Sequence, residues 1–118
     1  MSESTNSPIN LELLKQISEG DTEFEIEVLQ VYVEDNCKRI EEIREAIASK
    51  RYLEITQAAH HIKGASGNVG ATQLLNLSTI LEKMEHPQEP SLVNEIVEQM
   101  LEAMQDVKIF LREIESQG

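Results

Sequence analysis

Residues 21–49 read DTEFEIEVLQVYVEDNCKRIEEIREAIAS, with no glycine or proline among them. Apolar side chains recur in this stretch at spacings of three, four or their sums, namely Phe24, Val28, Val31, Tyr32, Ile40, Ile43 and Ile47. That period is typical of a helix. Asp21 is a suitable N-cap, and Glu23 and Glu25 in the first turn suit the helix dipole. The stretch therefore predicts one helix of about 27 residues, about 40 Å long.

Further helices are predicted on both sides of this stretch. Asn10 and Gly20 bracket a short amphipathic segment as N-cap and stop. After a break at residues 49–51, helical spacing continues over about 52–68 and 71–85. Residues 86–90 read HPQEP and are predicted to be a connector, because two prolines cannot lie inside a helix. Ser91 is the expected N-cap of the last helix.

One short helix followed by four long ones with short connections predicts an all-α fold. The expected architecture is an antiparallel four-helix bundle with a short extra N-terminal helix. The small, polar residues 1–8 are expected to form a disordered leader, and residues 9–116 the bundle. A chain of 118 residues suits a single domain.

The charge balance excludes several classes of partner. Lys and Arg number 10 against 22 Asp and Glu, which gives a net charge of −12. A nucleic-acid binder needs a basic face, and an anionic membrane also attracts basic segments, so neither partner is expected. The single cysteine, Cys37, allows no intrachain disulfide. No secretory signal and no apolar run of about 20 residues is found. We expect a cytoplasmic protein and a monomer.

The histidines give no metal-binding pattern. None of the histidines at positions 60, 61 and 86 follows a glutamate by three residues, as di-iron bundles require. His60 and His61 are adjacent, and adjacent helical residues point about 100° apart, so they do not share a metal easily. The glycines at 64, 67 and 70 lack the Gly-Lys-Ser/Thr ending of a P-loop. We therefore expect no metal site and no nucleotide site.

A helical wheel separates residues 55–69 into two faces. The expected core face consists of Ile55, Ala59, Ile62, Ser66 and Val69. A second, exposed face collects His60, Lys63, Gly64 and Gly67, and His61 falls on the other flank. Glycine inside a helix costs about 1 kcal/mol relative to alanine. Two glycines on one exposed face would let another macromolecule approach closely beside His60.

These residues suggest a histidine nucleophile that must meet a bulky partner, with the Lys63 ammonium near a phosphoryl group on the imidazole. From spacing alone, the alternative stays open that His60 is an ordinary surface histidine and that the glycines mark a fraying helix end.

The same residues carry a family resemblance. The run His60-His61-Ile62-Lys63-Gly64-Ala65-Ser66, followed by Gly70-Ala71, resembles the signature of histidine-containing phosphotransfer (HPt) domains. The likeness extends from about Ile9 to Ile114, including Gly20-Asp21 near the start and Leu81-Glu82 later in the chain. The resemblance implies a four-helix bundle with an exposed active histidine midway along one helix.

By this resemblance, His60 is the phosphorylated residue, Lys63 helps to bind the phosphoryl group, and Gly64 lets the partner approach. Glu82 lies where some members place a polar residue near the histidine, although an acid there disfavours a phosphoryl dianion and favours an imidazolium. His61 lies at a variable position.

The implied partners are receiver domains of hybrid histidine kinases and response regulators. A phospho-aspartyl receiver would donate to His60, and a second receiver aspartate would take the group. The chain would need no cofactor, because the receiver brings Mg²⁺, and it would have no ATP site of its own. Leu14 and Ile17 are candidate docking residues, and the alternative that they belong to the core stays open.

Two other functions compete with this one. A helical adaptor would dock receiver domains without carrying phosphate. A metal-dependent or hydrolytic bundle enzyme would require ligand clusters, and the sequence contains none.

Overall fold

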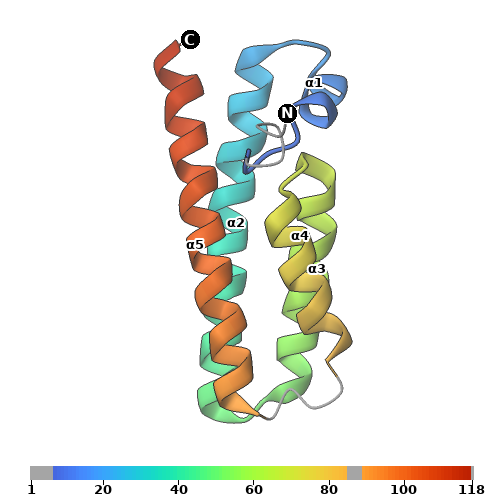
Figure 1. Cartoon of the computed structure of the whole chain (residues 1–118), viewed down its shortest axis with the longest axis vertical. Helices are drawn as coiled ribbons and strands as arrows, with labels where there is room; N and C mark the ends of the chain where they lie inside the picture. The colour runs from blue at the N-terminus through green and yellow to red at the C-terminus, as the bar shows by residue number, and fades with distance from the viewer. Residues whose placement is uncertain (1–6, 85–88, 118) are drawn as a thin grey trace.

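The computed structural model describes residues 7–84 and 89–117, and these residues form five helices and no strand (Figure 1). The helices are α1 (Leu11–Ser18), α2 (Thr22–Ser49), α3 (Tyr52–Val69), α4 (Thr72–Lys83) and α5 (Pro90–Gln117). In the bundle α2 neighbours α3 and α5, and α4 neighbours α3 and α5. The predicted all-α, antiparallel four-helix bundle with an extra N-terminal helix is confirmed.

The two longest helices set the dimensions of the bundle. α2 and α5 have 28 residues each, and the molecule extends 43 × 29 × 20 Å. α3 and α4 are shorter, and α1 lies beyond their upper end, next to α2 (Figure 1). The Asp21 side chain accepts from the backbone N–H of Phe24 at the start of α2, as predicted. At its end, Lys50 has a left-handed conformation, and the N–H of Arg51 donates to the Ala46 carbonyl.

Each of the four long helices buries one apolar face in a common core. The largest side chains of this core are almost completely buried. They include Leu29, Ile40, Ile43, Ile55, Ile62, Leu74, Leu81, Val93, Met100 and Met104. All five residues assigned to the core face of the third helix are buried, as predicted. Burying an aliphatic side chain of this size contributes about 1.5–3 kcal/mol, so these contacts supply most of the stability.

One buried polar contact joins α2 to α3. The hydroxyls of Tyr32 and Ser66 lie 2.6 Å apart, and Ser66 is completely buried. Burial raises the pKa of Tyr32 to about 12, so the phenol is neutral at physiological pH. Because neither hydroxyl can reach water, the pair restricts how α2 and α3 can slide along each other.

The segment before α1 is attached to the turn between α3 and α4. Ile9 is completely buried, and the backbone N–H of Asn10 donates to the Gly70 carbonyl (2.7 Å). Gly70 ends α3 with a φ of +79°, and a Cβ built there would lie 3.0 Å from the Cβ of Asn10. Only glycine suits this position, because it needs both the left-handed conformation and the close approach.

The structure corrects some local expectations. α5 begins at Pro90 and not after Ser91, so Ser91 is not its N-cap. Proline favours the first helical position because its φ is already helical and no N–H is needed there. α4 ends at Lys83, and not at about residue 85. Residues 1–6 of the predicted leader, and 85–88 with His86, lie outside the described residues.

We predict that Gly70→Ala lowers the free energy of unfolding by about 2 kcal/mol or more, because a left-handed alanine is disfavoured and its Cβ meets Asn10. Gly20→Ala is the matched control, since Gly20 also has a positive φ but no atom near its Cβ position. That control should lose only about 1 kcal/mol. Urea unfolding measures both losses, and equal losses would show that the contact with Asn10 contributes nothing.

Candidate functional site

His60 projects into solvent from the middle of α3. Its neighbours Ala59 and Ile62 are completely buried, and this places the His60 side chain outward with 70% of its surface exposed. Gly64, one turn later, is also exposed, whereas Lys63 and Gly67 are half-buried. The face predicted from the wheel is therefore present, and its centre is His60 and Gly64.

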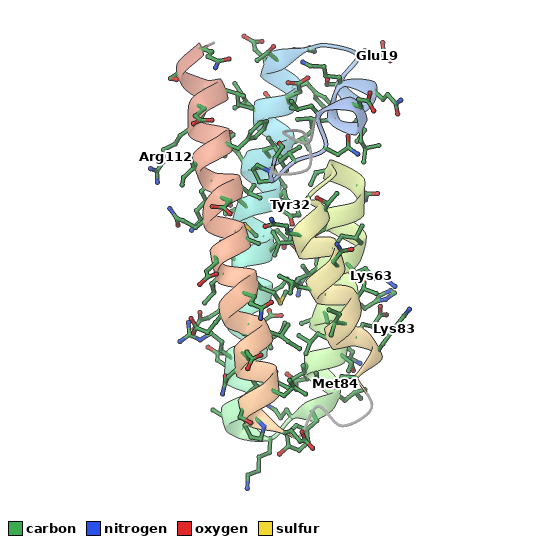
Figure 2. The ribbon with its side chains drawn as sticks, in the orientation of Figure 1. Glu19, Tyr32, Lys63, Lys83, Met84 and Arg112 are labelled. Atoms are coloured by element: carbon green, nitrogen blue, oxygen red, sulfur yellow. The ribbon has the colours of Figure 1, made fainter. Side chains whose placement is uncertain are left out.

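A glutamate from the neighbouring helix α4 links two of these side chains. Oε2 of Glu82 lies 2.5 Å from Nδ1 of His60, and Oε1 lies 2.7 Å from Nζ of Lys63. Lys63 projects from the α3–α4 side of the molecule, as does Lys83 (Figure 2). Hydrogen bonds from Lys63 and then from His60 lower the pKa of Glu82, so it is ionised at neutral pH. The structure thus brings together His60, Lys63 and Glu82.

This contact determines which nitrogen of His60 is free. An ionised carboxylate can only accept a hydrogen bond, so the proton of the neutral ring must be on Nδ1. Nε2 then has an unshared electron pair and points away from the Glu82 contact. An exposed imidazole nitrogen with a free electron pair is a nucleophile.

His61 contacts a carboxylate through its other ring nitrogen. Its Nε2 lies 2.7 Å from Oδ2 of Asp35 on α2. The hydrogen bond from His61 is the main cause that lowers the pKa of Asp35. The Asp35 carboxylate is therefore ionised and accepts this hydrogen bond. The neutral His61 ring therefore has its proton on Nε2. Adjacent positions on one helix give two histidines with different partners and different free nitrogens.

The two glycines of the face have space for a side chain. A Cβ at Gly64 would meet no atom within 4 Å, and one at Gly67 would meet only Leu75, at 3.9 Å. Packing within the chain therefore does not explain why either residue is glycine. What distinguishes Gly64 is that it leaves the backbone uncovered one turn from His60.

An apolar groove lies between α2 and α3 on the His61 side of this face. It has a volume of about 420 Å³, and its lining includes Phe24, Val28, Val31, Asp35, Ala65 and Asn68. Val31 is 68% exposed and Phe24 41%. The helical spacing of these two residues does not distinguish a groove from a core, so the sequence did not reveal it. The suggested docking residue Leu14 is buried, whereas Ile17 is exposed.

The described residues contain neither a metal-binding cluster nor a helix that could span a membrane. No group of three or more His, Cys, Asp or Glu side chains converges as a metal-binding cluster within 7–84 and 89–117. In those same ranges, every helix is too short or too polar to cross a membrane.

Comparison with known proteins identifies the type of domain. The family model described as Hpt domain matches residues 27–107. The crystal structure of histidine-containing phosphotransfer protein B (HptB) from Pseudomonas aeruginosa PAO1 superposes with a TM-score of 0.82. The two chains are 22% identical, and the match covers 96% of this chain and 98% of that one, which supports the fold. No protein with a curated description matches the chain.

The contacts of Glu82 give a test of this geometry. Lys63→Met should raise the pKa of Glu82 toward its ordinary value by more than His60→Gln does, because the bond from Lys63 is the larger cause of the lowering. Carboxyl ¹³C NMR titration measures both shifts. The pKa of Asp35 is the internal control and should stay low in both variants. A larger effect of His60→Gln would contradict the arrangement.

Proposed function

Because the chain belongs to the Hpt domain family, its role is histidine phosphotransfer in a two-component phosphorelay, and we propose that His60 is the residue that carries the phosphoryl group. His60 accepts this group from a phospho-aspartyl receiver domain and passes it to the aspartate of another receiver. Proteins of this family are phosphoryl carriers and not kinases, and the proposal gives this chain no ATP site.

The observation that carries the assignment is the free Nε2 of His60. The Nδ1 contact with Glu82 leaves Nε2 exposed and able to attack, whereas Asp35 occupies Nε2 of His61. A neutral imidazole nitrogen with a free electron pair can act as nucleophile. Exposure matters equally, because the phosphorus atom arrives on another protein.

The transfer needs no proton acceptor on this chain. Nε2 attacks phosphorus in line while the bond from phosphorus to the aspartyl oxygen breaks, and the carboxylate leaves with the electron pair. The phosphorylated ring keeps its Nδ1 proton and becomes a cation. Transfer to the second receiver is the reverse of this step. The chain needs no cofactor in this proposal, since the receiver supplies Mg²⁺ with its aspartate.

Lys63, Gly64 and Gly67 have supporting roles. The Lys63 ammonium neutralises phosphoryl oxygens, which is effective because phosphoryl transfer depends mainly on positioning and electrostatics. Gly64 lets the receiver backbone come close to His60, and the empty space at its Cβ position supports this role. Gly67 lies one turn further along the same face of α3, and the space at its Cβ position is smaller than that at Gly64.

The groove between α2 and α3 is the proposed docking surface for receivers. It adjoins the His60 face through the His61–Asp35 contact, and Val31 and Phe24 expose apolar surface there. Glu27 and Asp35 lie in the same lining. A receiver surface with an apolar patch flanked by basic side chains would complement both properties. Receivers of hybrid histidine kinases and of response regulators would use it in turn. In this function the protein acts as a monomer in the cytoplasm.

The assignment of His60 is tested by transfer from receivers phosphorylated beforehand, with Mg²⁺ present. Wild type and His61→Gln should become labelled, and the label should be acid-labile. His60→Gln should remain unlabelled while its circular dichroism is unchanged, because His60 is exposed. A labelled His60→Gln protein would exclude His60. If wild type stays unlabelled across a panel of the organism's hybrid-kinase receivers, the adaptor function replaces this one.

The docking surface is tested by Val31→Ala, which removes about 1–1.5 kcal/mol of apolar contact if Val31 is covered. The dissociation constant for a receiver should rise about five- to tenfold. Ile109→Ala is the control, because Ile109 is also exposed, at 44%, but lies on α5. Titration calorimetry measures both. An equal effect of the two substitutions would place the docking surface elsewhere.

A further inference from the structure

Asn36 is a buried polar side chain on the core face of α2. It is only 1% exposed and lies between Tyr32 and Ile40 in the helical row of buried residues. Asn36 also lines the groove between α2 and α3, together with the exposed side chains of Phe24 and Val31. Neither the packing of the bundle nor the transfer of the phosphoryl group requires an amide at this position.

One half of this amide has a partner and the other half has none. Nδ2 of Asn36 donates to the backbone carbonyl of Tyr32 at 2.8 Å. Because a carbonyl oxygen can only accept, the NH₂ group must face it, and Oδ1 is the atom left on the other side. This Oδ1 is buried and has no hydrogen-bond partner in the described part of the chain. A buried acceptor without a donor destabilises the folded state, so an apolar side chain would serve the core better.

Other polar groups near Asn36 differ from it. The hydroxyls of Tyr32 and Ser66, which also join α2 to α3, bind each other. Within residues 7–84 and 89–117, Arg39 Nε is the other buried polar atom without a partner. It belongs to a partly exposed guanidinium whose Nη1 donates to Glu42, and Arg39 lines a different pocket. The unpaired acceptor at the groove therefore belongs to Asn36 alone.

The groove and this acceptor together define the side chain that would fill them. Valine and phenylalanine side chains form much of the wall, and a groove of about 420 Å³ admits a large side chain. An uncharged donor suits Oδ1, because an ammonium or guanidinium that gave up its water there would lose more than one hydrogen bond returns. Tyrosine and tryptophan combine a large apolar ring with one neutral O–H or N–H donor, and both are enriched at protein interfaces.

Resting on the phosphocarrier function proposed above, we propose that Asn36 is a specificity-determining residue for receiver docking, and that its Oδ1 accepts a hydrogen bond from a tyrosine or tryptophan side chain of the receiver. The ring of this side chain contacts Val28 and Val31 in the groove. A receiver without such a side chain leaves Oδ1 unpaired and binds more weakly. A site built to pair with a polar group rejects partners that lack the group, and this selects among receivers.

Reaching Oδ1 requires a small rearrangement of the groove. Oδ1 is closed to water in the free protein, and the ring reaches it by displacing the side chains that line the groove beside it. Two of these, Val28 and Ala65, are only half-buried. Displacement of packed side chains costs free energy, and a ring that pairs with Oδ1 offsets this cost whereas a purely apolar ring does not. The rearrangement therefore increases the selectivity.

The first test uses p-cresol, which is the side chain of tyrosine, and 4-methylanisole, in which a methyl group replaces the hydroxyl hydrogen. The second compound is the more apolar one, so an entirely apolar groove would prefer it. Wild type should instead bind p-cresol about fivefold more tightly or better, because only p-cresol can donate to Oδ1. Asn36→Leu should lose this preference. Shifts of the groove amides in ¹H–¹⁵N spectra measure the dissociation constants.

Asn68→Leu is the matched control, because Asn68 lines the same groove but is exposed. It makes the same chemical change, and the preference for p-cresol should persist. Absence of binding or of a preference in wild type would overturn the proposal, and so would a preference that survives Asn36→Leu. These measurements involve no receiver and no phosphoryl group, so such a failure would leave the carrier function intact.

A second test separates a recognition role of Asn36 from a structural one. Leucine has the same branching as asparagine, and the Tyr32 carbonyl still accepts from the backbone N–H of residue 36 within the helix. The urea midpoint of Asn36→Leu should therefore stay unchanged or rise. The dissociation constant of a receiver that phosphorylates wild type should rise about tenfold in the same variant, as measured by titration calorimetry.

Both measurements can contradict the role of Asn36. A lower urea midpoint would show that Oδ1 has a structural partner in solution, such as Nε of Arg39, and an unchanged receiver affinity would show that no donor of the receiver reaches it. Either result would overturn the proposal. If no receiver phosphorylates wild type, the carrier function itself is wrong, and receivers are excluded as occupants of the groove.

Discussion

Burial of one face of α3 is the constraint from which the site geometry follows. Ile55, Ala59 and Ile62 are completely buried between the neighbouring helices. With that face inside, the rotation of α3 is determined, and His60 and Gly64 must point into solvent. The same rotation directs Lys63 toward α4, where Glu82 accepts from it. Packing energy that does not involve the His60 side chain therefore decides where His60 lies.

Two adjacent histidines show how neighbouring helices make identical side chains different. A turn of about 100° per residue directs His60 toward α4 and His61 toward α2. Each neighbour supplies one carboxylate, but Glu82 meets Nδ1 of His60 whereas Asp35 meets Nε2 of His61. The free nitrogen differs as a result. In a bundle of this kind, the contacts of each ring decide which of its nitrogens is free.

The polar and apolar parts of the proposed docking surface come from different properties of α2. Its inner side chains, such as Leu29 and Ile40, stabilise the bundle, while Phe24 and Val31 extend the apolar stripe beyond the part that α3 covers. An exposed apolar patch costs solubility, and the surrounding acidic side chains offset that cost. A surface of this composition suits a partner that must bind and then leave.

The sequence by itself determined the helices and, for α3, which face is buried. Residues 21–49 lack glycine and proline and follow the helical period, and local propensity and burial act on those properties directly. The sequence did not place every helix end correctly, because Pro90 begins the helix for which Ser91 was the expected cap. The sequence did not predict the contacts between helices, because these contacts depend on the rotation and register of both helices. Only the tertiary structure placed Glu82 against Nδ1 of His60 and left the groove beside Val31 uncovered, because each feature joins residues that packing alone brings together.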